Sequence, residues 1–73
     1  MNRADILYQL KEEQVKLFEE RYELFRQIRL LKDEGRYREA EALQKKILAS
    51  NGRMQDLNTA LEANGIDTKV VSF

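Results

Sequence analysis

The residues of this chain that could carry out chemistry are mainly carboxylates. Glu19 and Glu20 lie four and three residues before Glu23, so a helix would place these glutamates on neighbouring positions of one face. Helical bundles that bind two metal ions use such glutamates, pointing inward and combined with Glu-x-x-His motifs. The chain has no His and no Cys, which removes the commonest general base and metal ligand and every thiolate nucleophile. We expect no catalytic site and no metal site.

Phosphate chemistry is also unsupported by the sequence. The three glycines are scattered, so they form neither a phosphate-binding loop nor a nucleophile elbow. Arg21 could serve as an arginine finger only beside a phosphate site, and none is visible. We expect its side chain to have a structural role, with its stem buried and its head near Asp56 or Glu62. The prediction is a protein that is not an enzyme and has no cofactor.

Composition predicts long helices in a small, single domain. Charged residues make up 36 % of the 73-residue chain and hydrophobic residues 42 %, with no Pro. A chain of this length buries a modest core and has no disulfide to support it, so we expect it to associate with further copies or a partner. The longest apolar runs are three residues, which predicts a soluble, cytoplasmic protein with no membrane-spanning segment.

A seven-residue repeat predicts the first helix, over residues 3–34. Asn2 is its expected N-cap, with Asp5 three residues on. In heptad notation, the repeat fills the two seam positions a and d. The residues at d are Leu10, Leu17, Leu24 and Leu31, and those at a are Leu7, Gln14, Arg21 and Ile28. Polar residues at a usually fix the register or the oligomeric state.

Gly35 and Gly65 mark the expected helix ends, because glycine takes a left-handed backbone without steric cost. A turn at 35–36 would bring a second helix, residues 37–63, back antiparallel to the first. Its seam spacing continues across the Asn51-Gly52 dipeptide, which favours a continuous helix, with a kink at 51–52 as the alternative. The seam residues are Ala40, Leu43, Ile47, Ser50, Met54, Leu57 and Leu61. The predicted fold is therefore all-α: a coiled-coil-like two-helix hairpin (2–64), dimerised into a four-helix bundle, with a C-terminal tail (65–73).

A second apolar stripe lies beside the seam of the first helix. Together the two stripes span about 160° of the helix circumference, more than one partner helix covers. The predicted interface residues on this stripe are Tyr8, Val15, Phe18, Tyr22 and Phe25. Self-association into a four-helix bundle and a docking groove for a different protein are the two hypotheses, and they are compatible.

Basic residues are concentrated at the turn end of the predicted hairpin. Residues 26–46 carry a net charge of +3, whereas 1–25 carry −2 and 47–73 carry −1. The residues of this basic tip are Arg26, Arg29, Lys32, Arg36, Arg38, Lys45 and Lys46. Nucleic-acid binding is the functional interpretation. Acidic residues are interleaved with the basic ones, and Tyr37 is the one aromatic nearby, so we favour a solvated tip.

The tail ends in apolar residues and permits two interpretations. Val70, Val71 and Phe73 could form an extended ligand that adds to a partner's sheet edge. Alternatively, the tail folds back with Ile66 and covers Leu7 and Tyr8, which we favour.

The segment from Leu31 to Leu43, with its Gly35 turn and a following aromatic-x-x-Ala-x-x-Leu start, resembles tetratricopeptide hairpins and the UvrB/UvrC interaction motif. Both are protein-binding modules, but the helices here are too long for a tetratricopeptide repeat, and we assign no family. We predict a small protein-binding adaptor or inhibitor that forms a homo-oligomer. Nucleic-acid binding and a purely structural oligomerisation module are the alternatives.

Overall fold

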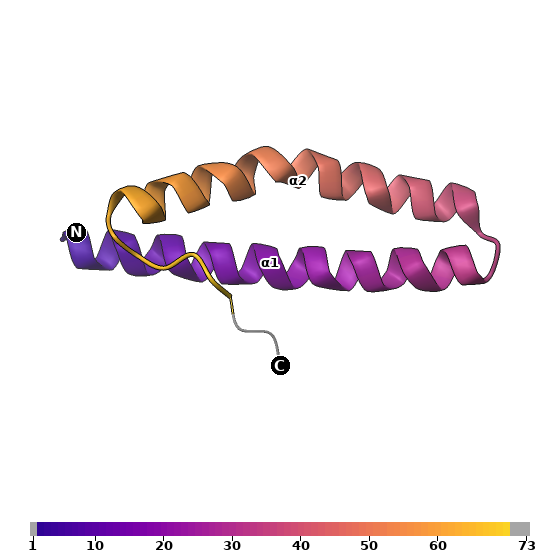
Figure 1. Cartoon of the computed structure of the whole chain (residues 1–73), viewed down its shortest axis with the longest axis horizontal. Coiled ribbons are helices and arrows are strands. Elements are labelled where there is room, and N and C mark those ends of the chain that lie inside the picture. Colours follow the sequence, from indigo (N-terminus) through magenta and orange to yellow (C-terminus); the bar gives the residue numbers. More distant parts are fainter. Residues whose placement is uncertain (1, 71–73) are drawn as a thin grey trace.

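The computed structural model describes residues 2–70 and contains two long helices. Helix α1 spans Arg3–Asp33 and α2 spans Tyr37–Ala63. They lie side by side and antiparallel, with the tail returning across α1 (Figure 1), in a molecule measuring 49 × 24 × 18 Å. The prediction of an all-helical fold with two helices packed against each other is confirmed.

Both helices end in the same type of turn. The backbone N–H of Gly35 donates to the Lys32 carbonyl, and that of Arg36 donates to the Leu31 carbonyl at 2.8 Å. Gly65 and Ile66 repeat this pattern at the end of α2. This is the Schellman arrangement, in which the C′ residue is left-handed. Gly35 has φ 76° and Gly65 φ 73°, as predicted for both glycines.

The α1 helix begins at a side-chain cap. The Asn2 side chain accepts a hydrogen bond from the backbone N–H of Asp5 at 2.9 Å, as the sequence predicts. Beside this cap, the Arg3 guanidinium donates to Asn64 Oδ1 at 2.6 Å, and Asn64 Nδ2 donates to the Ala60 carbonyl at 2.7 Å. The first bond joins the start of α1 to the end of α2 at the open end of the hairpin, and the second orients the Asn64 side chain on α2.

The core is a narrow strip between the two helices. Ile28, Ala40 and Ile47 form a buried cluster toward the turn, and Leu57 and Leu61 are buried nearer the open end. The four d leucines of α1 are only half-buried, whereas Gln14 and Ile28 at a are buried. At Gln14 and Ile28 the a row therefore lies closer to α2 than the d row, whereas Leu7 and Arg21 are half-buried like the d leucines at the edge of the contact. A two-helix hairpin has no third helix to cover that edge.

Helix α2 continues without interruption through Asn51 and Gly52. It bows away from α1 near its middle (Figure 1), and the helical hydrogen-bonded structure is kept through the bend. The seven-residue step from Ile47 to Met54 is therefore preserved across the glycine.

Replacing Gly52 by alanine is expected to raise the free energy of unfolding by about 0.5–1 kcal/mol. A Cβ at this position meets nothing within 4 Å, so alanine keeps the helix and restricts the unfolded chain. Gly35→Ala is the matched control, and it should destabilise the protein because its φ of 76° strains any residue with a Cβ. Thermal unfolding followed by circular dichroism measures both. A loss of stability in Gly52→Ala would show that the bend in α2 requires glycine.

Candidate functional site

The principal candidate site is an apolar groove on the face crossed by the tail. One part, with a volume of about 480 Å³, lies between Phe18, Tyr22 and Phe25 of α1 and Met54 of α2, with Val70 of the tail at its edge. A second part of about 460 Å³ continues toward the turn, where Phe25 and Arg21 meet Ile47 and Leu48. Because Arg21 and Phe25 line both parts, we treat them as one surface, the aromatic groove.

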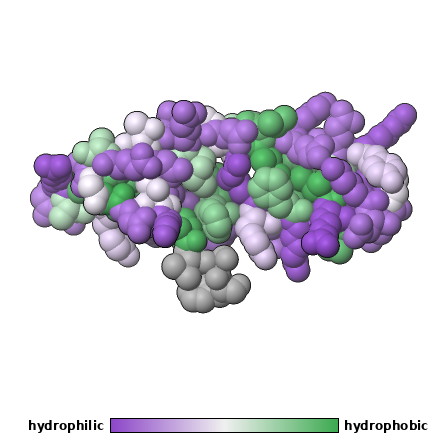
Figure 2. All heavy atoms as spheres, viewed as in Figure 1, coloured by the Kyte–Doolittle hydropathy of each residue, from purple (hydrophilic) through white to green (hydrophobic). Residues whose placement is uncertain are grey.

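Three large apolar side chains of the aromatic groove remain more than half open to solvent. Tyr22 is 58 % exposed, Phe25 54 % and Leu48 67 %. Hydrophobic residues gather near the middle of this face, with hydrophilic residues toward both ends (Figure 2). Exposed apolar area that gathers on one face of a small protein is typical of an interaction surface.

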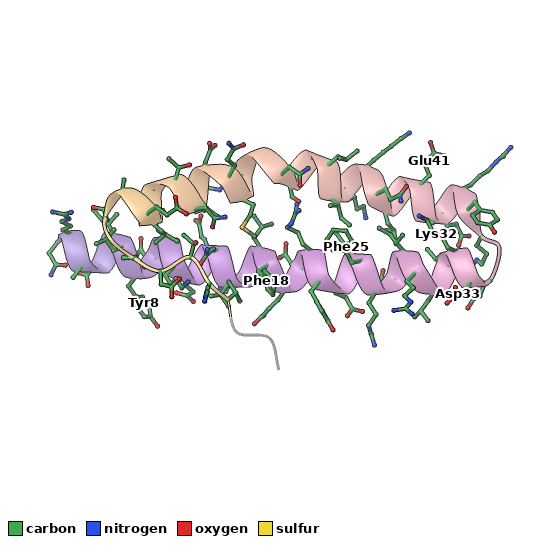
Figure 3. All side chains as sticks on the ribbon, viewed as in Figure 1. Tyr8, Phe18, Phe25, Lys32, Asp33 and Glu41 are labelled. Carbon is green, nitrogen blue, oxygen red and sulfur yellow. The ribbon has the colours of Figure 1, made fainter. Side chains whose placement is uncertain are left out.

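The predicted interface residues do not all share this groove. Phe18, Tyr22 and Phe25 line it, whereas Tyr8 is 73 % exposed and its side chain points away from α2 (Figure 3). Val15 is half-buried and is not among the lining residues. Tyr8, Val15 and Tyr22 lie seven residues apart, and an α-helix drifts by about 20° per heptad relative to such a repeat, so their side chains do not keep one orientation along α1.

The contribution of Leu48 in α2 to this groove was not predicted from the sequence. Leu48 directly follows the seam residue Ile47. It shares a helix face with Gln44 and Asn51, which are both polar, so Leu48 is the one apolar residue of the three. A single leucine beside a seam is a weak signal, because isolated exposed leucines are common on protein surfaces. Met54 was predicted as a seam residue and is half-buried at the edge of the groove.

A buried glutamine connects both helices to the tail beside the aromatic groove. Gln14 is 1 % exposed, and its amide Nε2 donates to Asn58 Oδ1 at 2.6 Å and to the Thr68 carbonyl at 2.8 Å. Its Oε1 accepts a hydrogen bond from Lys11 Nζ at 2.7 Å. Throughout residues 2–70, every buried side-chain nitrogen or oxygen has a hydrogen-bond partner. The polar residue at this seam position is therefore fully accommodated.

Arg21, the second polar residue of the seam, contacts neutral groups. Its guanidinium donates to the Ile47 carbonyl at 3.0 Å and to Ser50 Oγ at 2.5 Å. The prediction that its head reaches Asp56 or Glu62 is wrong. Arg21 and Ser50 occupy facing seam positions of antiparallel helices, so the hydroxyl lies nearer than either acid. The structural role predicted for Arg21 is consistent with these contacts.

The tail folds back over the hairpin in the part that the structure describes. Lys11 Nζ donates to the carbonyls of Asp67 at 2.8 Å and Lys69 at 3.0 Å. The described part of the tail does not cover Tyr8, which is 73 % exposed, because it crosses α1 about one turn further on, at Lys11. Its residue Val70 lines the groove together with Phe18. Val71 and Phe73, also predicted as tail contacts, lie outside the described residues.

The basic tip carries several ion pairs with the interleaved acids. Arg26 binds Glu23 at 2.8 Å, and Arg36 binds Glu34 at 3.3 Å and also Glu39. Hydrogen bonds from Arg26 and then Gln27 lower the pKa of the Glu23 carboxyl below its ordinary value. The bond to Glu23 raises the pKa of Arg26.

In the same way, hydrogen bonds to Glu39 and then Glu34 raise the pKa of Arg36. Both arginines therefore stay charged at all ordinary pH values. The other residues of the basic tip, Arg29, Lys32, Arg38, Lys45 and Lys46, are exposed.

No family model, curated protein or solved structure matches this chain.

No group of three or more acidic, His or Cys side chains is arranged to hold a metal ion between residues 2 and 70. Neither α1 nor α2 has a stretch long and apolar enough to cross a membrane.

Proposed function

We propose that this protein is a non-catalytic helical module for protein–protein interaction, acting as an adaptor or inhibitor on a larger protein partner and assembling as a homo-oligomer. The observation that carries the proposal is the aromatic groove, where Tyr22, Phe25 and Leu48 are each more than half exposed on one face. Aromatic side chains buried at interfaces contribute a large share of binding energy. Covering this groove would stabilise a chain whose own core is narrow.

Charge supports a protein partner over a nucleic acid. The chain has no net charge, and the exposed arginines Arg26 and Arg36 already bind carboxylates. Nucleic-acid binding depends on basic groups that replace counterions along the phosphate backbone. The interleaved acids at the basic tip reduce that attraction.

Phe25→Ser is expected to weaken self-association by about tenfold or more while leaving the helix content nearly unchanged. Phe25 lines both parts of the groove and is half exposed, so the substitution removes interface area without opening the core. Light scattering coupled to size-exclusion chromatography across micromolar concentrations measures association, and circular dichroism measures helicity. Tyr8→Ser is the matched control, because Tyr8 is an exposed aromatic of α1 outside the groove.

A wild-type chain that stays monomeric with a sharp thermal transition would contradict self-association. Loss of helicity together with assembly in Phe25→Ser would show that the groove belongs to the folding core. Partner capture from the source cell, compared between wild type and Phe25→Ser, tests the adaptor function. Salt-dependent retention of DNA or RNA in place of a protein would favour the nucleic-acid alternative, and self-association alone would favour a structural module.

A further inference from the structure

The described part of the tail is held mainly through its backbone. The carbonyls of Asp67, Thr68 and Lys69 are three successive acceptors, and they receive hydrogen bonds from only two side chains, Lys11 and Gln14. The next residue, Val70, lies at the edge of the aromatic groove. We call the donors Lys11 and Gln14, together with the adjoining end of the groove at Phe18, the tail seat.

One of the two donors of the tail seat is oriented by the opposite helix. Gln14 is 1 % exposed, and its amide is oriented by Asn58 of α2 at 2.6 Å. The Lys11 ammonium has three protons, and its three acceptors are the Asp67 and Lys69 carbonyls and Gln14 Oε1. Charge-assisted hydrogen bonds of this type are stronger than those between neutral groups. Gln14 is thus oriented by the hairpin, and Lys11 is directed at the tail backbone while it donates to Gln14 Oε1.

Recognition through carbonyl groups does not depend on the side chains that the peptide carries. Any extended segment presents similar carbonyls, and specificity comes from the pockets that receive its side chains. In the tail seat that pocket is the end of the aromatic groove, occupied at its edge by the apolar, β-branched Val70. The chain's own tail therefore demonstrates which ligand the seat accepts.

We propose that the tail seat is a binding site for an extended peptide segment, occupied by the chain's own tail as an intramolecular ligand that a segment of the protein partner displaces. The partner segment has three successive accessible carbonyls followed by an apolar residue. The statement about the partner rests on the proposed function, whereas occupation by the tail does not. Tethering gives the tail an effective concentration of about millimolar, so a displacing segment has to exceed the tail's own affinity.

The test uses the full-length chain and a synthetic peptide of residues 66–73 as the probe. Two substitutions release the tail from opposite sides of the contact. Val70→Ser weakens the binding of the tail to the tail seat and leaves the seat itself intact. The peptide should therefore bind to Val70→Ser about tenfold more tightly than to wild type. Lys11→Met removes the donor of three hydrogen bonds and keeps the aliphatic stem, so the peptide should bind about tenfold more weakly than to Val70→Ser.

Nuclear magnetic resonance of the labelled chain provides the readout. Peptide binding should shift the amide signals of Lys11, Gln14 and Phe18 and move those of residues 67–70 toward unstructured values, with the rest of the hairpin unchanged. Lys16→Met is the control, because Lys16 is an exposed lysine of α1 that pairs with Glu12. It should bind the peptide as wild type does.

A tail that merely caps the hairpin predicts a different result. In that case, millimolar peptide would leave the Lys11 and Gln14 signals of Val70→Ser unchanged, and the proposal would be overturned. Equal peptide affinities of Lys11→Met and Val70→Ser would overturn the proposal as well. If Lys11→Met does not fold, the peptide titration of Val70→Ser by itself decides whether the proposal holds. If Val70→Ser captures the protein partner to the same extent as wild type and still binds the peptide, displacement of the tail by the partner is refuted. The proposed function would still stand in that case.

Discussion

Replacing Leu61 by alanine is expected to lower the free energy of unfolding by about 2–5 kcal/mol. Leu61 is completely buried, and it packs near Leu57 in the part of the core nearest the open end. Domains of this size have a total stability of about 4–11 kcal/mol, so the loss is a large fraction of the whole. The Leu61 carbonyl keeps its hydrogen bond from Ile66 in the variant, so the change isolates the side chain.

Urea denaturation monitored by circular dichroism measures this loss at a fixed protein concentration, because association would add to the apparent stability. Leu30→Ala makes the same change on α1 at a side chain that is 53 % exposed. Its cost should stay below about 1 kcal/mol. Equal losses in the two variants would show that Leu61 is not part of a packed core.

Gln14→Glu is expected to cost about 1–3 kcal/mol and to release the tail. The substitution keeps the shape of the side chain and replaces the amide nitrogen by a carboxylate oxygen. That oxygen would face Asn58 Oδ1 and the Thr68 carbonyl, two acceptors now held at 2.6 and 2.8 Å from a donor. The remaining contact with Lys11 becomes an ion pair, which offsets part of the loss.

Chemical denaturation gives the change in stability, and the amide signals of residues 67–70 report release of the tail. Gln9→Glu is the same substitution at an exposed position of α1, and it should alter neither measurement. A Gln14→Glu protein as stable as wild type, with its tail still docked, would show that the Gln14 contacts contribute little.

The hairpin could be predicted because its determinants are local. The seven-residue spacing indicates each helix, and Gly35 and Gly65 lie where a left-handed backbone is needed. The spacing alone does not say which row faces the partner helix. The d leucines, represented by Leu24, are half-buried, whereas Ile28 at a is buried, because only one helix packs against α1.

The tail seat could not be predicted, for a different physical reason. Its acceptors are backbone carbonyls, which every residue has, so the sequence of the tail carries no signal for them. Gln14 was recognised as a polar residue in an apolar seam, but its partners Asn58 and Thr68 are 44 and 54 residues away along the chain. The groove was predicted in part. Its α1 side consists of residues at helical spacing, namely Phe18, Tyr22 and Phe25, whereas no apolar residues at such spacing accompany Leu48 on its face of α2.

The tight turn at Gly35, between the two helices, also bears on the order in which the contacts of the hairpin form. Contacts near the turn join residues close in sequence, whereas the bond between Arg3 and Asn64 closes a separation of 61 residues and that between Lys11 and Lys69 one of 58. Loop-closure entropy increases with separation, so we expect folding to start at the turn and the most distant contacts to form last. Residues beside the turn should therefore exchange their amide hydrogens most slowly. The tail seat would empty during brief local openings that leave the rest of the hairpin folded.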